Sequence, residues 1–332
     1  MVETVTTTST ATQERSPELG VWLGEGESSY ADVKRQGPLI EESVTPLSPG
    51  ARSVHASILS GGDVVSVDVS LEGRFTGVSV IDPAYVGFIL PLSHSQDYVL
   101  NGVNLPVSSL SLMVRAAPLY IRGGSRRTLG IVVPAGRLAT TVAALRGVDE
   151  DSVRLSSGLL RLPASAMQAT RDRLVAITAA SGARASGRTG SQWAEEVLAI
   201  LIDALLQSEP NDYARSRRST RAANVVRRAE EWFLAAAGNR VSLADLCRAA
   251  DVGSTALYEA FERVCGESPL AYLRKRQLTR ARLALLNGLQ PERGAIKRAA
   301  LNAGLTHLGR FSVEYRELFG ESPSTTLSKL HL

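Results

Sequence analysis

The chain has 332 residues, more than one average domain holds, which predicts two domains. A hydrophobic fraction of 44% and a charged fraction of 21% exclude a fibrous or wholly disordered protein. Its two cysteines are too few for a disulfide framework or a four-thiolate zinc site. Because no apolar run is long enough to span a membrane and the N-terminal residues lack the apolar core of a signal peptide, we expect a cytoplasmic protein.

Charge is divided unevenly along the chain. Residues 1–209 carry 17 Lys and Arg against 21 Asp and Glu, whereas residues 210–332 carry 20 against 12. Such asymmetry favours contact between the C-terminal part and a polyanion, although a basic solvated surface gives the same balance. Charge therefore narrows the class of partner without identifying it.

The N-terminal part is expected to be β-rich. Residues 1–50 mix Ser, Thr, Glu and Pro with little periodicity, so we expect a flexible lead-in with low order before about Val54. Between residues 51 and 136, short apolar or alternating runs are separated by turn residues such as Gly61-Gly62-Asp63. This pattern predicts a β meander or barrel of about eight strands.

Helical periodicity replaces the strand pattern over residues 137–208, the predicted helical linker and dimerisation region. One face of its last helix, in SQWAEEVLAILIDALLQSE, carries the candidate dimerisation residues Trp193, Val197, Ile200 and Leu201. Packing onto the barrel would use the same face, and both roles are compatible; we favour dimerisation. Residues 209–219 are polar and basic, which predicts an interdomain linker ahead of a second domain over residues 220–332.

The second domain contains an internal repeat. FERVCGESPLAYL starts at Phe261 and YRELFGESPSTTL starts at Tyr315, an offset of 54 residues. In each GESP, Gly can end one helix in a left-handed conformation, Ser can cap the next helix, and Pro suits its first turn. Both copies are therefore predicted to be corners between helices.

Two shorter helices precede each corner at helix-turn-helix spacing. Ser242 and Ser254 are expected to cap the two helices of the first copy, and Thr306 the second helix of the second copy. The predicted inward residues are Leu257, Phe261, Phe311 and Tyr315. A connecting helix over Pro269–Asn287 would be about 29 Å long. One turn of DNA is about 34 Å, so the two modules could enter successive major grooves.

Residues 225–330 resemble the AraC/XylS-type transcriptional regulators. The resemblance rests on ADLCRAADVGSTALYEAF, GESPLAYLRKRQLTRARLALL and GLTHLGRFSVEYRELFGESPS, the last of which corresponds to the family's second helix-turn-helix signature. It implies that a monomer or dimer binds promoter DNA, with a homodimer favoured, and that RNA polymerase and an unknown small-molecule effector are further partners. Residues 54–134 are similar to the family's cupin-like sensor barrel, although less specifically. The expected fold is therefore α+β, with a cupin-like barrel and an all-α domain of two helix-turn-helix modules joined by a long helix.

Carried over by position, the resemblance implies two sets of DNA-contacting residues. The base-contact candidates are Thr255, Tyr258, Glu259, Leu308, Gly309, Arg310 and Val313. The phosphate-contact candidates are Ser254, Arg263, Arg274, Arg276, Arg280, Thr306, His307 and Arg316. Arg310 is the strongest base-contact candidate, because arginine can donate two bonds to guanine, although a phosphate contact is its alternative. Glu259 either accepts from cytosine or pairs with Arg263 on the surface.

An enzyme is the rival class, but the sequence does not favour it. The four histidines are scattered, and no G-x-S-x-G, P-loop or H-E-x-x-H motif occurs. We therefore expect no catalytic residues, no cofactor and no metal. The predicted function is a DNA-binding transcriptional regulator, more specifically an activator, modulated by an effector in the N-terminal domain. The alternative is a DNA-anchored scaffold whose barrel binds a protein; it predicts a filled barrel and an exposed apolar patch instead of an apolar cavity.

Overall fold

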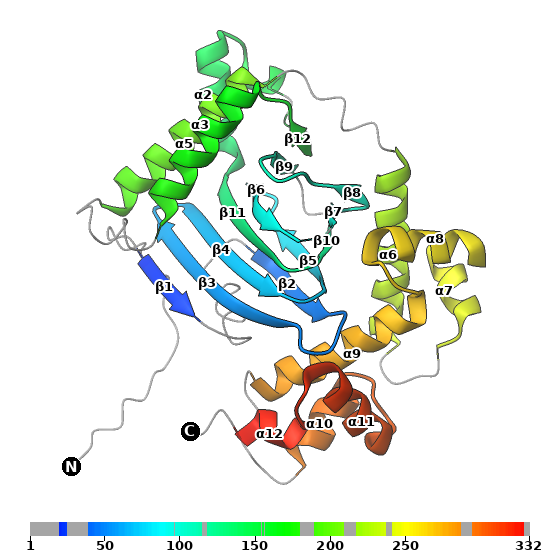
Figure 1. The fold of residues 1–332 in the computed structure, drawn as a ribbon. Coiled ribbons are helices and arrows are strands. Elements are labelled where there is room, and N and C mark those ends of the chain that lie inside the picture. Colours follow the sequence, from blue (N-terminus) through cyan, green and yellow to red (C-terminus); the bar gives the residue numbers. More distant parts are fainter. Residues whose placement is uncertain are drawn as a thin grey trace, which may run out of the picture.

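The computed structural model describes residues 20–24, 39–95, 97–114, 118–153, 155, 157–179, 189–208, 217–236, 241–286 and 294–328. A β-rich N-terminal region is followed by a helical C-terminal region, as predicted (Figure 1). Of the helices in these ranges, none combines the length and the apolar character needed to cross a bilayer.

Two sheets make up the N-terminal region. The strands are β1 (Gly20–Gly24), β2 (Leu39–Pro46), β3 (Arg52–Gly61), β4 (Val64–Glu72), β5 (Phe75–Ile81), β6 (Tyr85–His94), β7 (Tyr98–Leu100), β8 (Val103–Asn104), β9 (Leu110–Val114), β10 (Leu119–Gly123), β11 (Arg126–Pro134) and β12 (Gly158–Leu160). The seven-stranded sheet has the order β1-β3-β4-β11-β6-β9-β12, and the five-stranded sheet has the order β2-β5-β10-β7-β8. Their paired strands run antiparallel. Cupin-like closure into a barrel stays a prediction.

Two strands precede residue 51, where the sequence led us to expect low order. β1 pairs with β3, and β2 pairs with β5 over seven residues that end at Pro46 opposite Phe75. An added strand gains its backbone hydrogen bonds from a neighbour distant in sequence, so composition alone does not show it. β12 lies in the region predicted to be helical. It was missed for the same reason, because its backbone hydrogen bonds come from pairing with β9. The rest of the expected lead-in lies outside the described residues.

Helices cover the outer face of the seven-stranded sheet (Figure 1). They are α2 (Ala135–Arg146), α3 (Ala164–Thr178) and α5 (Gly190–Gln207), with a short 3-10 turn at Glu150–Ser152. The candidate dimerisation residues of α5 pack into this core, where Trp193, Val197 and Leu201 are 0% exposed and Ile200 is 5% exposed. The Trp193 indole also donates to the carbonyl of Ile177 over 3.0 Å. The predicted dimer seam was therefore wrong at these residues, because the face is buried against the chain's own sheet.

The C-terminal region consists of α6 (Arg217–Ala235), α7 (Leu243–Ala250), α8 (Ser254–Cys265), α9 (Pro269–Leu286), α10 (Ala295–Asn302), α11 (Leu308–Phe319) and α12 (Pro323–Ser328). α6 begins at Arg217, inside the predicted linker. α6, α7 and α8 with the start of α9 form one core, and α10, α11 and α12 with the end of α9 form another. Each helix-turn-helix module thus has its own core, joined through α9.

Local sequence explains the helix ends. Ser242 caps α7 as predicted, accepting from the Asp245 amide, and the Asp245 side chain completes a capping box that was not predicted from the sequence. Gly266 and Gly320 end α8 and α11 with φ of 73° and 72°, in the left-handed region where glycine is favoured. The caps predicted from Ser254 and Thr306 were wrong: α8 begins at Ser254 behind Gly253, and α11 follows His307, in both cases without a side-chain cap.

Candidate nucleic-acid interface

The helices α8 and α11 each bury one face and expose the other. Leu257 and Phe261 of α8, and Phe311 and Tyr315 of α11, are all 0% exposed, which confirms the predicted inward positions. Each module therefore holds its second helix rigidly while the opposite face stays accessible. This is the arrangement that a major groove requires of a recognition helix.

The exposed faces carry most of the base-contact candidates. Thr255, Tyr258 and Glu259 are exposed on α8, and Gly309, Arg310 and Val313 on α11. Thr255 and Gly309, like Glu259 and Val313, occupy equivalent positions of the 54-residue repeat. Leu308 is half-buried and packs partly against the core of its own module, so it presents less of its side chain than its neighbours.

Arg310 is held by an ion pair within its own helix. Its Nε lies 2.7 Å from Oε1 of Glu314, one helical turn later, and its side chain is 72% exposed. The other oxygen of Glu314 pairs with Arg274 of α9 at 2.7 Å. Because the bond to Glu314 uses Nε, the terminal nitrogens of Arg310 take no part in it, and these are atoms that guanine recognition can use.

The phosphate-contact candidates divide into three groups. Those with exposed side chains are Ser254, Arg263, Arg280, Thr306, His307 and Arg316. Arg274 is partly exposed and already paired with Glu314. Arg276 is 3% exposed and its Nε lies 2.5 Å from Oε1 of Glu230. The prediction for Arg276 was therefore wrong, because a buried guanidinium that pairs with a carboxylate cannot reach DNA.

A buried polar cluster, which the sequence did not reveal, surrounds Glu230. Besides Arg276, the hydroxyl of Tyr120 donates to Oε2 of Glu230 over 3.0 Å, and that of Tyr272 donates to Oε1 over 3.3 Å. Burial, and then the nearby Glu230 carboxylate, raise the pKa of both tyrosines, so both hydroxyls stay protonated. Burial likewise raises the pKa of Cys265, which is inconsistent with a nucleophilic thiol. The sequence signal that could have indicated this cluster is the Glu230 carboxylate on the apolar face of α6.

Tyr120 comes from the five-stranded sheet, so this cluster also joins the two regions. Val78 of β5 and Tyr120 of β10 pack into the core of the first helix-turn-helix module. The Arg122 guanidinium donates to the carbonyl of Arg263 over 3.3 Å, and Lys275 donates to the carbonyl of Leu47 over 2.8 Å. The outer face of this sheet is therefore docked on α6, α8 and α9.

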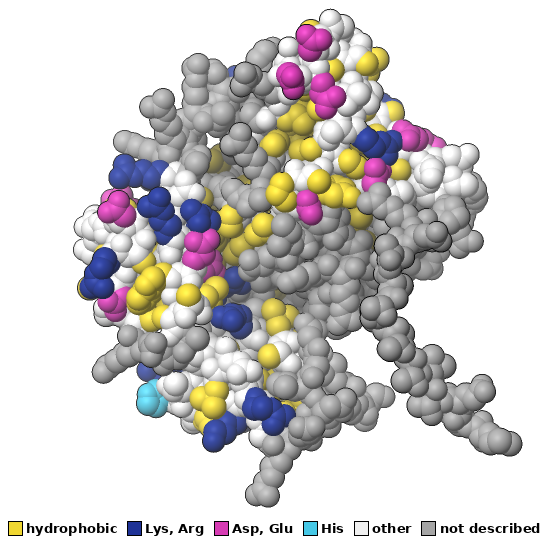
Figure 2. Space-filling view, turned by 180° about the vertical axis from the view of Figure 1, so that it is seen from behind, with side chains coloured by type: hydrophobic (Ala, Val, Ile, Leu, Met, Phe, Trp, Pro, Cys, Tyr) yellow, Lys and Arg dark blue, Asp and Glu magenta, His cyan; other side chains and the backbone are white. Residues whose placement is uncertain are grey.

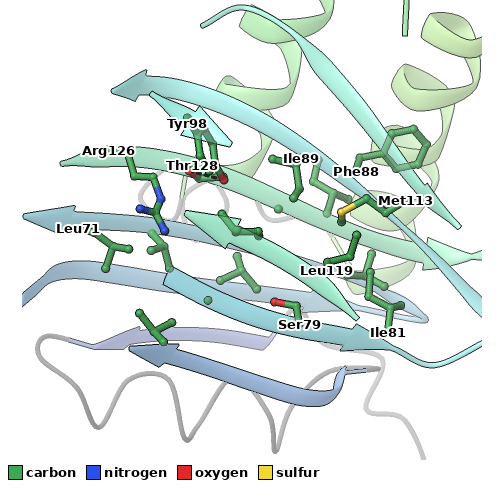
Figure 3. Close-up of a pocket in the computed structure, with 18 residues that line it drawn as sticks. Leu71, Ser79, Ile81, Phe88, Ile89, Tyr98, Met113, Leu119, Arg126 and Thr128 are labelled. Carbon is green, nitrogen blue, oxygen red and sulfur yellow. Dashed lines mark hydrogen bonds between the residues drawn. The ribbon is translucent and has the colours of Figure 1, made fainter. Parts of the chain in front are cut away.

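The inner face of the same sheet lines a cavity of about 120 Å³ between the two sheets (Figure 3). On β5, Gly77 and Ser79 face the cavity while Val78 faces the helices. On β10, Leu119 and Ile121 face the cavity on either side of Tyr120. Because successive side chains of a strand point to opposite faces of the sheet, neighbouring residues of β5 and β10 contact the cavity and the docked module in turn. One layer of backbone therefore separates the cavity from that module.

Surface charge differs between the helical C-terminal part and the opposite end of the molecule. Figure 2 shows Lys and Arg side chains over the helical C-terminal part, with acidic ones interspersed, whereas acidic side chains gather at the opposite end of the molecule. Glu150, Asp151 and Asp149 lie at that acidic end, beside α2, and are exposed. A polyanion would therefore be attracted to the helical end.

Comparison with known proteins agrees with this geometry. Residues 246–329 match the family model described as "Helix-turn-helix domain". The XylDLEGF operon transcriptional activator 2 of Pseudomonas putida is 42% identical over 88 residues, which are 26% of this chain and 55% of that protein. A probable AraC family transcriptional regulator of known structure from Rhodopseudomonas palustris is 34% identical, covering 32% of this chain and 97% of that one with a TM-score of 0.28.

The C-terminal domain is of the AraC/XylS type. The matched residues of this AraC/XylS-type domain include α8, α9, α10 and α11, hence both helices with exposed base-contact candidates. The N-terminal region lies outside the family match, and the matching segment spans about half the length of the Pseudomonas putida relative. The AraC-like transcriptional activator CuxR covers 86% of this chain and all of its own, at 13% identity and a TM-score of 0.40.

Proposed function

We propose that the protein is a sequence-specific DNA-binding transcriptional regulator, an activator whose DNA binding responds to a small molecule held between the two sheets. The observation that carries the proposal is the pair of exposed recognition faces on α8 and α11. They are joined by α9, whose 18 residues give a length of about 27 Å. This length suits two successive major grooves on one face of DNA.

The docked sheet supports the small-molecule response. A ligand changes DNA affinity only by binding one arrangement of the two regions more tightly than another. Leu119 and Ile121 would contact the ligand, whereas Tyr120 between them contacts Glu230. A shift of β10 by a bound ligand would therefore alter the docking of the first module. Coupling of about 1–3 kcal/mol is the magnitude expected of such devices.

The scaffold alternative is less well supported. It predicts a filled interior, and the space between the sheets is instead a cavity with mostly apolar walls. In the described part of the chain, large exposed apolar side chains are spread over several elements, including Leu145 of α2, Trp232 of α6, Leu301 of α10 and Val313 of α11. Homodimerisation and contact with RNA polymerase belong to the proposal, with any dimer contact away from the buried face of α5.

The test is selection of bound duplexes from a random pool by the full chain, followed by affinity measurement at increasing salt. Phosphate contacts release counterions, so the logarithm of affinity should fall linearly with the logarithm of salt concentration. Enrichment of one sequence class, with weaker binding to scrambled duplexes, would support sequence-specific regulation. Absence of enrichment, or a salt-independent affinity, would contradict it.

A further inference from the structure

Most polar side chains of the cavity between the sheets lie at one end, although Leu71 is also at that end and Ser79 lies toward the other. Figure 3 shows Arg126, Tyr98 and Thr128 at one end. Toward the other end lie Phe88, Ile89, Ile81, Met113 and Leu119. Such walls select an amphipathic molecule with one polar group, because an apolar body gains from burial while its polar group needs partners.

Arg126 is the buried cation at the polar end. It is 8% exposed, and on β11 it alternates with outward-facing Arg127, while Thr128, Gly130 and Val132 of the same strand also line the cavity. Its recorded contacts in the described residues are a long bond of 3.4 Å from Nη1 to the carbonyl of Gly124 and the ring of Tyr98, whose centroid is 5.1 Å from Cζ. These contacts leave most of its donors for a ligand.

Two arginines of α9 with little exposed surface differ from Arg126 in having a carboxylate partner. Arg276 pairs with Glu230, and Arg282 pairs with Glu321 at 2.8 Å. Among the described residues no ion pair is recorded for Arg126. Arginine cannot become neutral in a protein, and a buried unpaired charge is costly. The described residues that line the cavity include no carboxylate, so the positive charge of Arg126 remains for a ligand to neutralise.

On the strand next to Arg126 lies a buried polar atom that has no hydrogen-bond partner among the described residues. His94 of β6 is directly opposite Arg126 of β11, so the two side chains share a face. Its Nε2 is buried without a hydrogen-bond partner among the described residues, and its ring contacts that of Tyr98 at 6.1 Å. The guanidinium of Arg126, with its paired N–H donors, suits a planar anion with two oxygens.

We infer that this cavity binds a small apolar carboxylate whose carboxylate group contacts Arg126 and whose hydrocarbon body lies among the apolar residues. Size limits the body to about one six-membered ring, because a cavity of about 150 Å³ holds one benzene molecule. The inference deepens the proposed function, on which its regulatory consequence rests, by assigning the chemical class of the effector. Binding itself is independent of DNA.

Three probes of one shape test the charge requirement on the full chain by calorimetry and thermal shift. They are cyclohexanecarboxylate, neutral cyclohexanecarboxamide and cationic cyclohexylmethylammonium. Binding and stabilisation should be strongest with the carboxylate and absent with the cation. Loss of a charge-assisted bond weakens binding by about 10- to 100-fold, which is the expected difference between carboxylate and carboxamide. Equal effects of these two, or no effect of the carboxylate, would overturn the inference.

Two variants and a control locate the site. Arg126→Met should weaken carboxylate binding by about 10- to 100-fold while the midpoint of unfolding stays unchanged or rises, since an unpaired buried charge is removed. Gly130→Val should block the carboxylate by filling the cavity, because a Cβ there meets nothing nearer than the Val67 carbonyl at 3.8 Å. Arg127→Gln, facing outward toward Asp68, is the control and should bind normally. Normal carboxylate binding by both Arg126→Met and Gly130→Val would contradict the assignment.

Measuring DNA affinity with and without cyclohexanecarboxylate separates this inference from the proposed function. If the carboxylate binds but DNA affinity does not change, the ligand class stands and ligand-responsive regulation fails. If DNA is bound sequence-specifically but the carboxylate is not bound, the ligand class fails and DNA-binding regulation stands.

Discussion

In each helix-turn-helix module, an arginine of α9 with little exposed surface pairs with a carboxylate beside a tyrosine hydroxyl. In the first module Arg276 pairs with Glu230, which also accepts from Tyr272. In the second, Arg282 pairs with Glu321 and donates to the hydroxyl of Tyr315 over 3.1 Å. These three residues of the second cluster all belong to its own module, whereas the first cluster includes Tyr120 from the β-sheet.

This difference shows how one repeated sequence can serve two roles. Leu257 and Phe261 of the first module match Phe311 and Tyr315 of the second, so the two small cores are built alike. Among the described residues, the core of the first module includes neighbours from the N-terminal region, and the core of the second does not. We therefore expect the first module to respond to the state of the sheet and the second to bind DNA independently of it.

The largest effect should come from breaking the first cluster. Glu230→Gln leaves Arg276 buried without its carboxylate, and removal of one member of a buried ion pair costs about 3–5 kcal/mol. Glu321→Gln should cost less, because Arg282 keeps its contacts with the rings of Tyr315 and Phe319. Urea unfolding of the full chain measures both losses. A loss at Glu321 as large as that at Glu230 would contradict the asymmetry.

Base recognition offers the next test of the comparison. The repeat places Arg310 of the second module opposite Ala256 of the first, so this arginine is specific to the second module. Arg310→Ala should relax preference at one base pair by about 1–3 kcal/mol. Arg316 is a phosphate-contact candidate on the same helix. Arg316→Ala should lower the affinity for all DNA sequences alike and make the logarithm of affinity fall less steeply with the logarithm of salt concentration. If Arg310→Ala lowered the affinity for all DNA sequences equally, Arg310 would be a phosphate contact and not a base contact.

The hydroxyl of Tyr120 tests whether the sheet is coupled to the first module. Tyr120→Phe removes one bond to Glu230, which keeps its other partners, so we expect about 1 kcal/mol of lost stability. The effect of cyclohexanecarboxylate on DNA affinity should fall with it. Tyr315→Phe is the matched change in the second module and should lower stability without changing that effect. An unaltered ligand effect in Tyr120→Phe would show that coupling takes another route.

The smallest effect concerns the cap of α7. Hydrogen bonds from Ser242 lower the pKa of Asp245. A carboxyl whose folded pKa is depressed contributes stability above its unfolded pKa of about 4, and loses it as pH falls through the folded value. Ser242→Ala should therefore be less stable than the wild type near neutral pH, with this part of the difference vanishing in acid. Unfolding midpoints from neutral pH down to about pH 3 provide the measurement; a difference that grew in acid would contradict the sign.

Predictions from sequence succeeded where a few neighbouring residues decide the outcome. The GESP corners at Gly266 and Gly320, the helix cap at Ser242 and the inward residues Phe261 and Phe311 follow from helix geometry and local hydrogen bonding. The exposed base-contact candidates follow too, because a helix that buries one face exposes the other. The family match over residues 246–329 falls on this part of the chain.

By itself the sequence thus determined most strands between residues 52 and 134, the three N-terminal helices, and the helices of the C-terminal region with their accessible faces. Tertiary structure alone decided what each apolar face packs against and which charges are buried. The pattern of α5 was the same for a dimer seam and for packing on a sheet, and the structure chose the sheet. Arg276 and Arg280 look alike in the sequence of α9, yet Glu230, 46 residues earlier, buries only the former. Such outcomes depend on contacts between distant residues, and periodicity carries no information about the partner.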